Sequence, residues 1–360
     1  MKKLKISSMW MAAFMVAMTT QTNAKVWRVN NQTGVSADFS SVSTAISSAS
    51  VLAGDTLYVE GSPVSYGTVT LSKKLVIIGT GYFLSSNDST QAYPAASTFD
   101  NMTISSAAAG SSIIGIQISY SNSASSITSL TISANNILIS HCYIYCYNLG
   151  STYSSYCIQS SSSYVIIEKS FIYNSSTTGS PRAIYFTSGS SNLISNNIIK
   201  MGTKSSSGGS AIYMLSSSSS FQFINNVIIG DMYAYNSYIA NNIQIIGSYS
   251  TSSTYPNTTR NNIGHSTQFG TSDGNKSNVT MTTVFTYGGS ENYDNHYTLK
   301  TGSPAIGAGS SGEDCGAFGG NNPYILSGMP PIPAIFNATF PTTGTTTGGV
   351  NINIKAKAHD

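Results

Sequence analysis

Four stretches from the middle of the chain decide its fold: ISHCYIY (139–145), IEKSFIY (167–173), ISNNIIK (194–200) and INNVIIG (224–230). In each, a small or polar residue precedes apolar, β-prone residues at nearly constant spacing. This column contains Gly115, Cys142, Ser170, Asn197 and Asn226. A second column runs in parallel and contains Ile104, Ile132, Ile158, Ile184 and Ile212. Two such registers predict a solenoid, because each repeat of about 28 residues can bury its apolar face only against its neighbours.

The apolar runs within each repeat are too short for helices. In one repeat they cover 184–186, 193–194 and 198–199, separated by Ser, Gly and Asn. Such punctuation is typical of strand boundaries, and helical periodicity is missing. We therefore predict an all-β fold in which short parallel strands wind into a right-handed coil, with consecutive turns about 4.8 Å apart.

Paired asparagines mark a repeated corner of this coil. The pairs are Asn196-Asn197, Asn225-Asn226, Asn241-Asn242 and Asn261-Asn262. Asn tolerates the left-handed backbone of a tight bend, and stacked side-chain amides can hydrogen-bond from turn to turn. We predict a structural ladder made of Asn197, Asn226, Asn242 and Asn262. A sugar-binding role for these residues stays open, and the shorter steps after Asn226 indicate either tighter turns or a slip in register.

The composition favours strands and argues against a nucleic-acid partner. Charged residues make up 8% of the 360 residues and the net charge is +3, so there is no basic footprint. The 23 tyrosines and the many β-branched residues favour strands. Four cysteines, Cys142, Cys146, Cys157 and Cys315, are too few for a disulfide framework. We expect Cys142 and Cys146 to pack in the core or to form one local bridge, and we expect neither a metal site nor a cofactor.

Residues 1–24 have the features of a secretory signal peptide. Lysines at 2, 3 and 5 precede a short apolar stretch, and Thr22-Asn23-Ala24 offers a cleavage site. The apolar stretch is too short to span a bilayer, and no later segment looks transmembrane. We therefore expect the mature chain to be secreted, extracellular or located at the outer cell surface.

Both ends of the remaining chain resemble a known family. GDTLYV (54–59) and LSKKLVIIG (71–79) are similar to the opening coil of secreted right-handed parallel β-helix proteins of the pectin-lyase-like superfamily, and the chain also resembles such proteins from the Bacteroidetes. The resemblance implies a β-helix over 25–320, a capping helix at 43–49 with Phe39 over the end of the coil, and a final coil at 297–318. The superfamily hosts lyases, hydrolases, esterases and adhesins, so the resemblance leaves the chemistry open.

The sequence changes character after Gly320. A Pro-rich connector (321–333) leads into a C-terminal β-hairpin module (334–360), with strands expected at 334–340 and 350–358. The hairpin either shields the open lower edge of the coil or docks onto another protein by strand addition.

Groups suited to catalysis are sparse. Glycoside hydrolysis uses two carboxylates about 5–9.5 Å apart, yet positions 110–271 contain only Glu168 and Asp231. The NTD, DD and GHG motifs of hydrolases in the superfamily are missing, as is the Asp cluster of its pectate lyases. Stacking places His141 below Lys169 with Glu168 beside it, and such a group could serve a uronic-acid lyase. Arg182 is a further catalytic candidate. The alternative interpretation of the group around His141 is a solvated polar corner.

Tyrosines provide the candidate ligand-binding residues. Tyr145, Tyr173, Tyr185 and Tyr213 fall on successive turns. Outward-facing rings would form an amphipathic platform for sugars or for a protein partner, whereas inward-facing rings would be core packing. The sequence leaves both interpretations open.

These observations lead to three functional hypotheses. The leading one is a secreted, non-enzymatic extracellular or cell-surface β-helix protein, adhesin-like or glycan-binding, with a polysaccharide or another cell-surface protein as partner. The alternative is a polysaccharide lyase or glycoside hydrolase that acts on an acidic glycan. The third is a filament or matrix subunit that self-associates through its C-terminal strands.

Overall fold

The computed structural model of the chain describes residues 24–123, 125–148, 150, 153–177, 179–202, 209–215, 220–287, 293–341, 343 and 349–358. All of the expected signal peptide except Ala24 lies outside these residues. Within the described ranges, no helix is long and apolar enough to cross a membrane.

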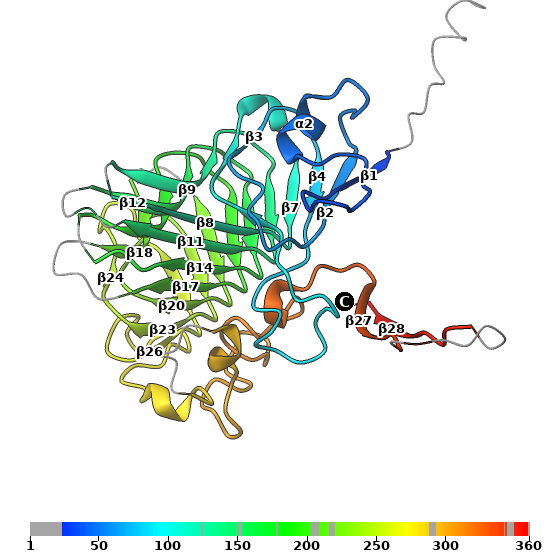
Figure 1. Cartoon of the computed structure of the whole chain (residues 1–360). Helices are drawn as coiled ribbons and strands as arrows, with labels where there is room; N and C mark the ends of the chain where they lie inside the picture. Colours follow the sequence, from blue (N-terminus) through cyan, green and yellow to red (C-terminus); the bar gives the residue numbers. More distant parts are fainter. Residues whose placement is uncertain are drawn as a thin grey trace, which may run out of the picture.

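The chain is a right-handed parallel β-helix, as the repeats predict (Figure 1). Sheet A contains β1 (Val26–Val29), β2 (Thr56–Val59), β4 (Val76–Ile78), β7 (Ser112–Ile114), β10 (Leu138–Ser140), β13 (Ile166–Glu168), β16 (Asn192–Ser195), β19 (Phe221–Ile224), β22 (Tyr238–Ala240) and β25 (Thr258–Arg260). Sheet B contains β3 (Val69–Leu71), β6 (Met102–Ile104), β9 (Ile127–Ile132), β12 (Ser155–Ser160), β15 (Arg182–Phe186), β18 (Ser210–Met214), β21 (Met232–Tyr233) and β24 (Tyr249–Ser250). Sheet C contains β5 (Thr98–Phe99), β8 (Gln117–Asn122), β11 (Tyr143–Asn148), β14 (Phe171–Asn174), β17 (Ile198–Met201), β20 (Val227–Ile229), β23 (Ile243–Ile246) and β26 (Ile263–Gly264).

Each full coil passes through sheets A, C and B in turn, and its apolar residues fill the interior. One interior column in sheet A is fully buried and contains Ile113, Ile139, Ile167, Ile194, Phe223 and Ile239. Burying each such side chain stabilises the fold by about 1.5–3 kcal/mol relative to leaving it exposed. The cap helix α2 (Val42–Ser47) begins after Ser41, whose side chain accepts a hydrogen bond from the backbone N–H of Thr44. Phe39 packs on Trp27 at the edge of sheet A.

The asparagine ladder is confirmed. The backbone N–H of Asn197 donates to the side-chain oxygen of Asn226 at 3.0 Å, and Asn226 donates in the same way to Asn242 at 2.9 Å. Asn262 continues the series and donates to Asn275, a further member that the sequence did not indicate. The late turns are tighter, rather than out of register. Upstream, the ladder passes to Ser170, whose hydroxyl accepts from the backbone N–H of Cys142.

Two predicted vertical alignments are wrong by one or two residues. Gly115 lies above His141, not above Cys142, because Ile114 pairs with Ser140. Likewise, Ile132 pairs with Ser160, whereas Ile158 pairs with Leu130. The loops between the strands differ in length from coil to coil, so a constant sequence step does not identify neighbours to the residue.

The parallel strands end at β26, before the boundary of 320 that the resemblance implied. The segment resembling a final coil instead folds back across the outer face of sheet C. Tyr297 of this segment, with Met281, Val284 and Phe285 of the stretch before it, packs on outward-facing residues of the sheet such as Phe171. The short 3-10 helices of this region are η2 (Met281–Thr283), η3 (Asp294–Tyr297) and η4 (Leu326–Gly328), whereas η1 (Ser106–Ala108) lies within the coil. The chain thus has a second apolar core outside the coil.

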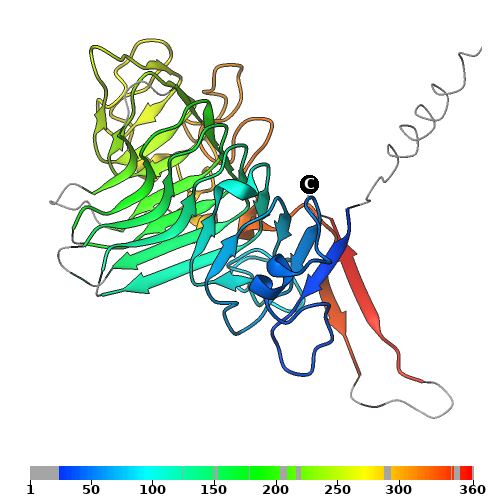
Figure 2. The same ribbon diagram turned by 90° about the horizontal axis from the view of Figure 1, so that it is seen from above.

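The predicted C-terminal hairpin forms from β27 (Ala334–Thr339) and β28 (Asn353–Lys357), paired antiparallel. It does not shield the lower edge of the coil. The chain after the last coil runs back toward the N-terminal coils, and the hairpin projects from the body beside them (Figures 1 and 2). Its root is held by a backbone hydrogen bond from Ala92 to Ile335 at 2.8 Å and by packing of Ala334 with Leu84 and Met329.

Candidate functional site

The corner between sheets A and C is a column of left-handed residues. The first member of each asparagine pair adopts a positive φ, and His141 and Lys169 do the same in the same column. The φ values are 57° for His141, 47° for Lys169, 54° for Asn196, 55° for Asn225, 59° for Asn241 and 53° for Asn261. The next residue in each turn points inward and joins the ladder. The two residues of each pair therefore have different roles. The first forms the bend, and the second forms hydrogen bonds to the next turn.

Residues 305–330, which we call the strap, run along this corner. The outward-facing asparagines hold it through their side-chain amides. Asn261 donates to the carbonyl of Ala308 at 3.0 Å, Asn225 to that of Asp314 at 3.0 Å, and Asn196 to that of Gly319 at 2.8 Å. These asparagines bind the protein's own chain, which satisfies their amide groups without a sugar.

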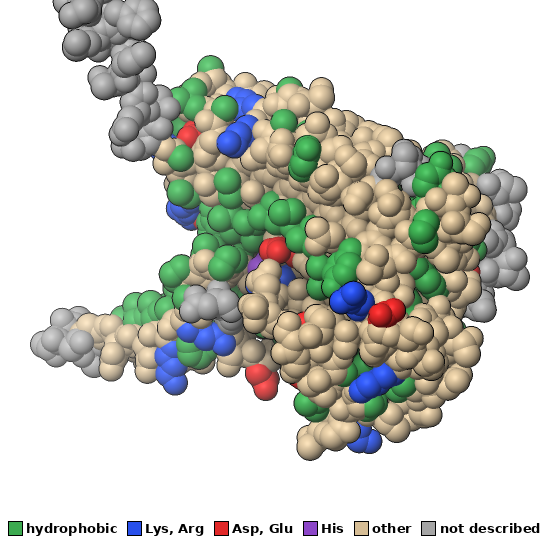
Figure 3. Space-filling view, turned by 180° about the vertical axis from the view of Figure 1, so that it is seen from behind, with side chains coloured by type: hydrophobic (Ala, Val, Ile, Leu, Met, Phe, Trp, Pro, Cys, Tyr) green, Lys and Arg blue, Asp and Glu red, His purple; other side chains and the backbone are tan. Residues whose placement is uncertain are grey.

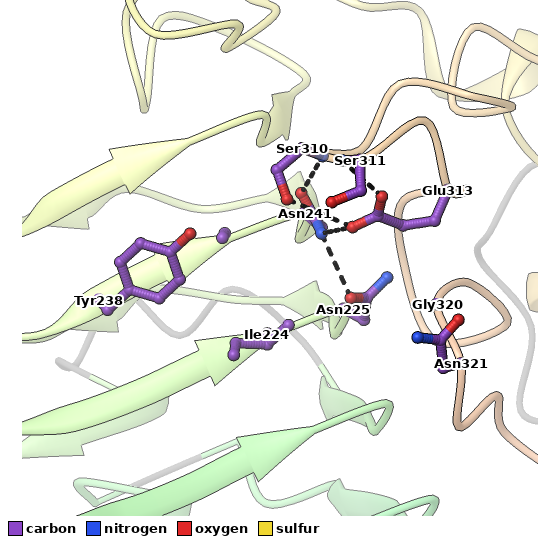
Figure 4. Close-up of a pocket in the computed structure, with 10 residues that line it drawn as sticks. Ile224, Asn225, Tyr238, Asn241, Ser310, Ser311, Glu313, Gly320 and Asn321 are labelled. Carbon is purple, nitrogen blue, oxygen red and sulfur yellow. Dashed lines mark hydrogen bonds between the residues drawn. The ribbon is translucent and has the colours of Figure 1, made fainter.

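A cavity of about 340 Å³ lies between the strap and this corner (Figure 4). Its carboxylate, Glu313, accepts hydrogen bonds from Asn241 at 2.6 Å and from the backbone N–H of Ser311 at 2.7 Å. No second acid and no base lie among the lining residues. The cavity therefore lacks the paired groups of a glycoside hydrolase.

The structure brings His141, Glu168 and Lys169 together, as the stacking predicts, but as a covered cluster. His141 is 5% exposed and Lys169 is 9% exposed, so the corner is not solvated either. The strap lies directly on it, because a Cβ atom on Gly328 would collide with the carbonyl oxygen of His141. Glu168 accepts hydrogen bonds from Ser140 at 3.0 Å and from Asn322 of the strap at 3.0 Å.

Burial also removes the acid–base capacity of His141. Burial first, and the neighbouring positive charge of Lys169 second, lower the pKa of His141 to about 3. The ring is therefore neutral at physiological pH, and its Nδ1 lies 2.7 Å from the hydroxyl of Ser140. A base that is covered by the protein's own chain does not reach a polysaccharide. The hypothesis that this cluster is catalytic finds no support in its geometry.

The lowered pKa of His141 predicts an acid sensitivity. In the unfolded chain His141 binds a proton near pH 6.5, whereas in the fold it does so only near pH 3. Its contribution to stability is thus present above pH 6.5 and is lost as the pH falls toward 3, by up to about 1.4 kcal/mol per pH unit. His141→Asn suits the left-handed backbone and should remove this part of the pH dependence. Denaturant unfolding of both proteins at about pH 7 and pH 4.5 measures it, and equal losses would contradict the assignment.

The candidate tyrosines are divided between two sheets. Tyr145 and Tyr173 lie in sheet C, with ring centroids 5.5 Å apart, next to the covered face. There the hydroxyl of Tyr145 lies 2.7 Å from that of Ser175, and the ammonium of Lys200 lies 5.0 Å from the ring of Tyr173. Tyr185 and Tyr213 pair in sheet B, with centroids 5.9 Å apart. One platform through all four residues, as the sequence allowed, does not exist.

Sheet B carries a larger array, which we call the tyrosine–arginine face. Its half-buried members are Tyr156, Arg182, Tyr185, Tyr213 and Tyr233. Their rings form a continuous row, with centroid distances of 4.9 Å from Tyr156 to Tyr185 and 5.3 Å from Tyr213 to Tyr233. The guanidinium carbon of Arg182 lies 3.8 Å from the ring centroid of Tyr213 and 4.2 Å from that of Tyr185. Such cation–π contacts fix the orientation of a long side chain.

Arg182 has no acidic partner in the described part of the chain. The ion pair found there joins Arg28 to Glu60, and the Nε of Arg182 is buried without a hydrogen-bond acceptor. Arg182 belongs to sheet B, away from Glu168 in sheet A, so the two do not form a common catalytic site. Asp231, near Tyr233, accepts hydrogen bonds from the backbone and the hydroxyl of Ser248. The face therefore presents aromatic rings and one unpaired cation.

The four cysteines are buried as free thiols. Cys142 and Cys146 form no local bridge, and the Cys142 thiol points to the carbonyl oxygens of Ile113 and Ser140. Burial raises the pKa of Cys142 to about 12. Among the described residues, no cluster of three or more His, Cys, Asp or Glu residues could hold a metal ion.

No protein-family model and no curated protein sequence matches this chain. Similar solved structures include the deglycosylated pectin methylesterase from Aspergillus niger, with 16% identity and a TM-score of 0.38 over 72% of this chain and 90% of that chain. Pectate lyase Pel9A is 12% identical, with a TM-score of 0.39 over 82% of this chain and 96% of that chain. Both are right-handed parallel β-helix proteins. At this level of similarity, the likeness assigns no role to any residue of this chain.

Proposed function

We propose that this chain is an extracellular, non-enzymatic β-helix protein that binds an acidic polysaccharide on its tyrosine–arginine face. The observation that carries the proposal is Arg182, held against two tyrosine rings with no carboxylate partner among the described residues. A half-buried aromatic row with an unpaired guanidinium among its rings is complementary to a chain of uronic acid residues. The export signal expected at 1–24 supports the extracellular location.

Two kinds of contact would hold such a ligand. The faces and edges of the tyrosine rings offer flat amphipathic surfaces for the apolar faces of sugar rings. The guanidinium presents paired N–H donors that match a carboxylate, and such charge-assisted hydrogen bonds are about twice as strong as neutral ones. The rigid parallel strands keep the rings at fixed spacing, so little ordering is needed on binding.

The surroundings of this face support binding without cleavage. Hydrolysis uses two carboxylates facing each other across the scissile bond, and Asp231, at one end of the face, is already bonded to Ser248. The cluster around His141 is covered by the strap. Among the residues that the structure describes, neither the face nor the corner supplies the acid–base pair of the lyase or hydrolase alternative.

Arg182→Ala should weaken binding of oligogalacturonate or oligoalginate at least tenfold, which is about 1.4 kcal/mol. Tyr213→Ala should also weaken it, because the ring supports both the sugar and the guanidinium. Arg260→Ala is the matched control, since Arg260 is exposed on sheet A. Isothermal titration calorimetry at two salt concentrations measures these effects, and binding should fall at high salt.

Three results would refute the proposal. Unchanged affinity of Arg182→Ala would show that Arg182 does not contact the ligand. Equal affinity of the unmutated protein for a neutral glucan would show that the face does not select acidic polysaccharides. Shortened or unsaturated sugar after incubation with the unmutated protein would show that the ligand is a substrate.

A further inference from the structure

The C-terminal hairpin has one apolar face and one polar face. In β28, Ile354 and Ala356 lie on one side and Asn353, Lys355 and Lys357 on the other. Continuing the same alternation into the residues before β28 places Val350 and Ile352 on the side of Ile354. Register places Ile335 opposite Ala356 and Ala338 opposite Ile354, so β27 contributes to the same apolar side. Phe340, which follows β27, continues the alternation from Ala338 and lies on the same apolar side.

This apolar side faces solvent. The exposed fractions are 47% for Ile335, 64% for Phe340, 55% for Val350, 51% for Ile352 and 54% for Ile354. Hydrophobic side chains are visible along the projecting arm in Figure 3, next to lysines. The body of the protein contacts the root of the hairpin, where Ala334 packs with Leu84 and Met329 and the backbone of Ala92 bonds to Ile335. A contiguous apolar patch of this kind indicates an interaction surface.

We propose that two copies of this chain associate through their hairpins, apolar face against apolar face, about a two-fold axis. The hairpin is a two-stranded sheet, and such sheets are marginally stable until a face is covered. The apolar side carries no charge, so a symmetric pairing buries it without desolvating a charge. Lys355 and Lys357 lie on the other side of β28, where Lys355 is exposed and the ammonium of Lys357 lies 5.5 Å from the ring of Phe336.

The area of the patch is large enough for pairing with a second copy of the chain. Its exposed side chains present roughly 500 Å² per copy, so pairing removes roughly 1,000 Å² from water, near the lower limit of specific interfaces. The hairpin projects from the coil (Figure 2), and the large apolar side chains of this side are exposed in the single chain. A lipid surface is the competing occupant, but two lysines supply only about 2 kcal/mol of attraction to anionic lipid.

The pairing is independent of the glycan proposal but adds to it. Two tyrosine–arginine faces on one dimer would bind a long polysaccharide with avidity, because the second contact becomes intramolecular. Affinity for a short oligosaccharide, measured per copy, should not depend on the dimer.

Sedimentation velocity of the purified full chain, diluted through the micromolar range, tests the proposal. We expect a reversible monomer–dimer equilibrium in the unmutated chain. Ile352→Lys/Ile354→Lys should weaken association at least about tenfold. The control is Asn353→Lys, which adds one positive charge between these two positions but on the other side of the hairpin, and should leave dimerisation unchanged. Both sites are exposed, so neither change removes core packing, and circular dichroism checks the fold.

Cross-linking provides a second measurement that does not depend on a loss of association. The native cysteines are buried, so an introduced exposed cysteine reacts selectively. Ile352→Cys should give a covalent dimer with a short bifunctional reagent, whereas Asn353→Cys should not. A chain that stays monomeric throughout, equal association of the Ile352→Lys/Ile354→Lys variant, or a monomer that binds anionic vesicles through this face would overturn the proposal.

Discussion

Asn226→Ala should lower the free energy of unfolding by about 3–5 kcal/mol. The side chain of Asn226 donates to the carbonyl of Ile194 at 2.8 Å and to the side-chain oxygen of Asn242 at 2.9 Å. Its own oxygen accepts from the backbone and the side chain of Asn197, both at 3.0 Å. All of these groups are buried, so alanine leaves several donors and acceptors without partners inside the coil.

Denaturant unfolding, followed by circular dichroism, measures this loss. Asn337→Ala is the matched control, because Asn337 is exposed on the hairpin and should change stability by less than about 0.5 kcal/mol. A stability of Asn226→Ala within the same margin would mean that the stacked amides contribute nothing net, and that apolar packing alone holds the turns in register.

Asp294→Ala should destabilise the chain by a similar amount, about 3–5 kcal/mol, and should release the strap. Asp294 is fully buried, and burial raises the pKa of its carboxyl group. Its oxygens accept hydrogen bonds from the backbone N–H of Ser327 at 2.6 Å, from Asn87 at 2.9 Å and from the hydroxyl of Tyr324 at 3.2 Å. Tyr324 in turn bonds to Tyr82. One carboxylate thus ties the strap to the loop after β4.

Two opposing effects decide the sign of this change. Removing a buried carboxylate recovers the cost of its desolvation, but it also leaves the buried donors around it without an acceptor. The density of donors around Asp294 makes the second effect larger. Asp294→Asn, which keeps the size and one acceptor oxygen, should lose less. Limited proteolysis should cut Asp294→Ala within 305–330 sooner than the unmutated chain, and equal resistance with unchanged stability would contradict this account.

The coil itself was predictable because its determinants are local. Alternating Ile and Val residues, the Asn pairs and their spacing reflect contacts that recur in every turn. The same logic located the ladder at Asn197 and Asn226. It misplaced Gly115 by one residue, because the loop lengths that set the register vary and carry no pattern of their own.

The strap could not be predicted in the same way. Asn196 contacts residues more than 120 positions away, and such pairing leaves no periodic signal. The only trace is the density of small residues at 302–320, which permits close approach to the corner. Because the strap was unforeseen, the cluster around His141 looked accessible from the sequence although it is covered.

The tyrosine–arginine face was half-predictable. Tyr185 and Tyr213 were recognised from their register, and Arg182 was singled out, but as a catalytic candidate. Tyr233 was missed as a member of the face. The sequence gives the order of strands along each turn, yet which outward columns remain uncovered depends on where the C-terminal region folds back.

Hydrogen exchange with and without an acidic oligosaccharide tests the central claim most directly. We predict slower exchange in peptides covering β12, β15 and β18, no change at the corner formed by 138–142 and 166–170, and an intact sugar by mass spectrometry. Protection of that corner, or recovery of a shortened sugar, would contradict the account and would favour the alternative that the chain is a polysaccharide-cleaving enzyme.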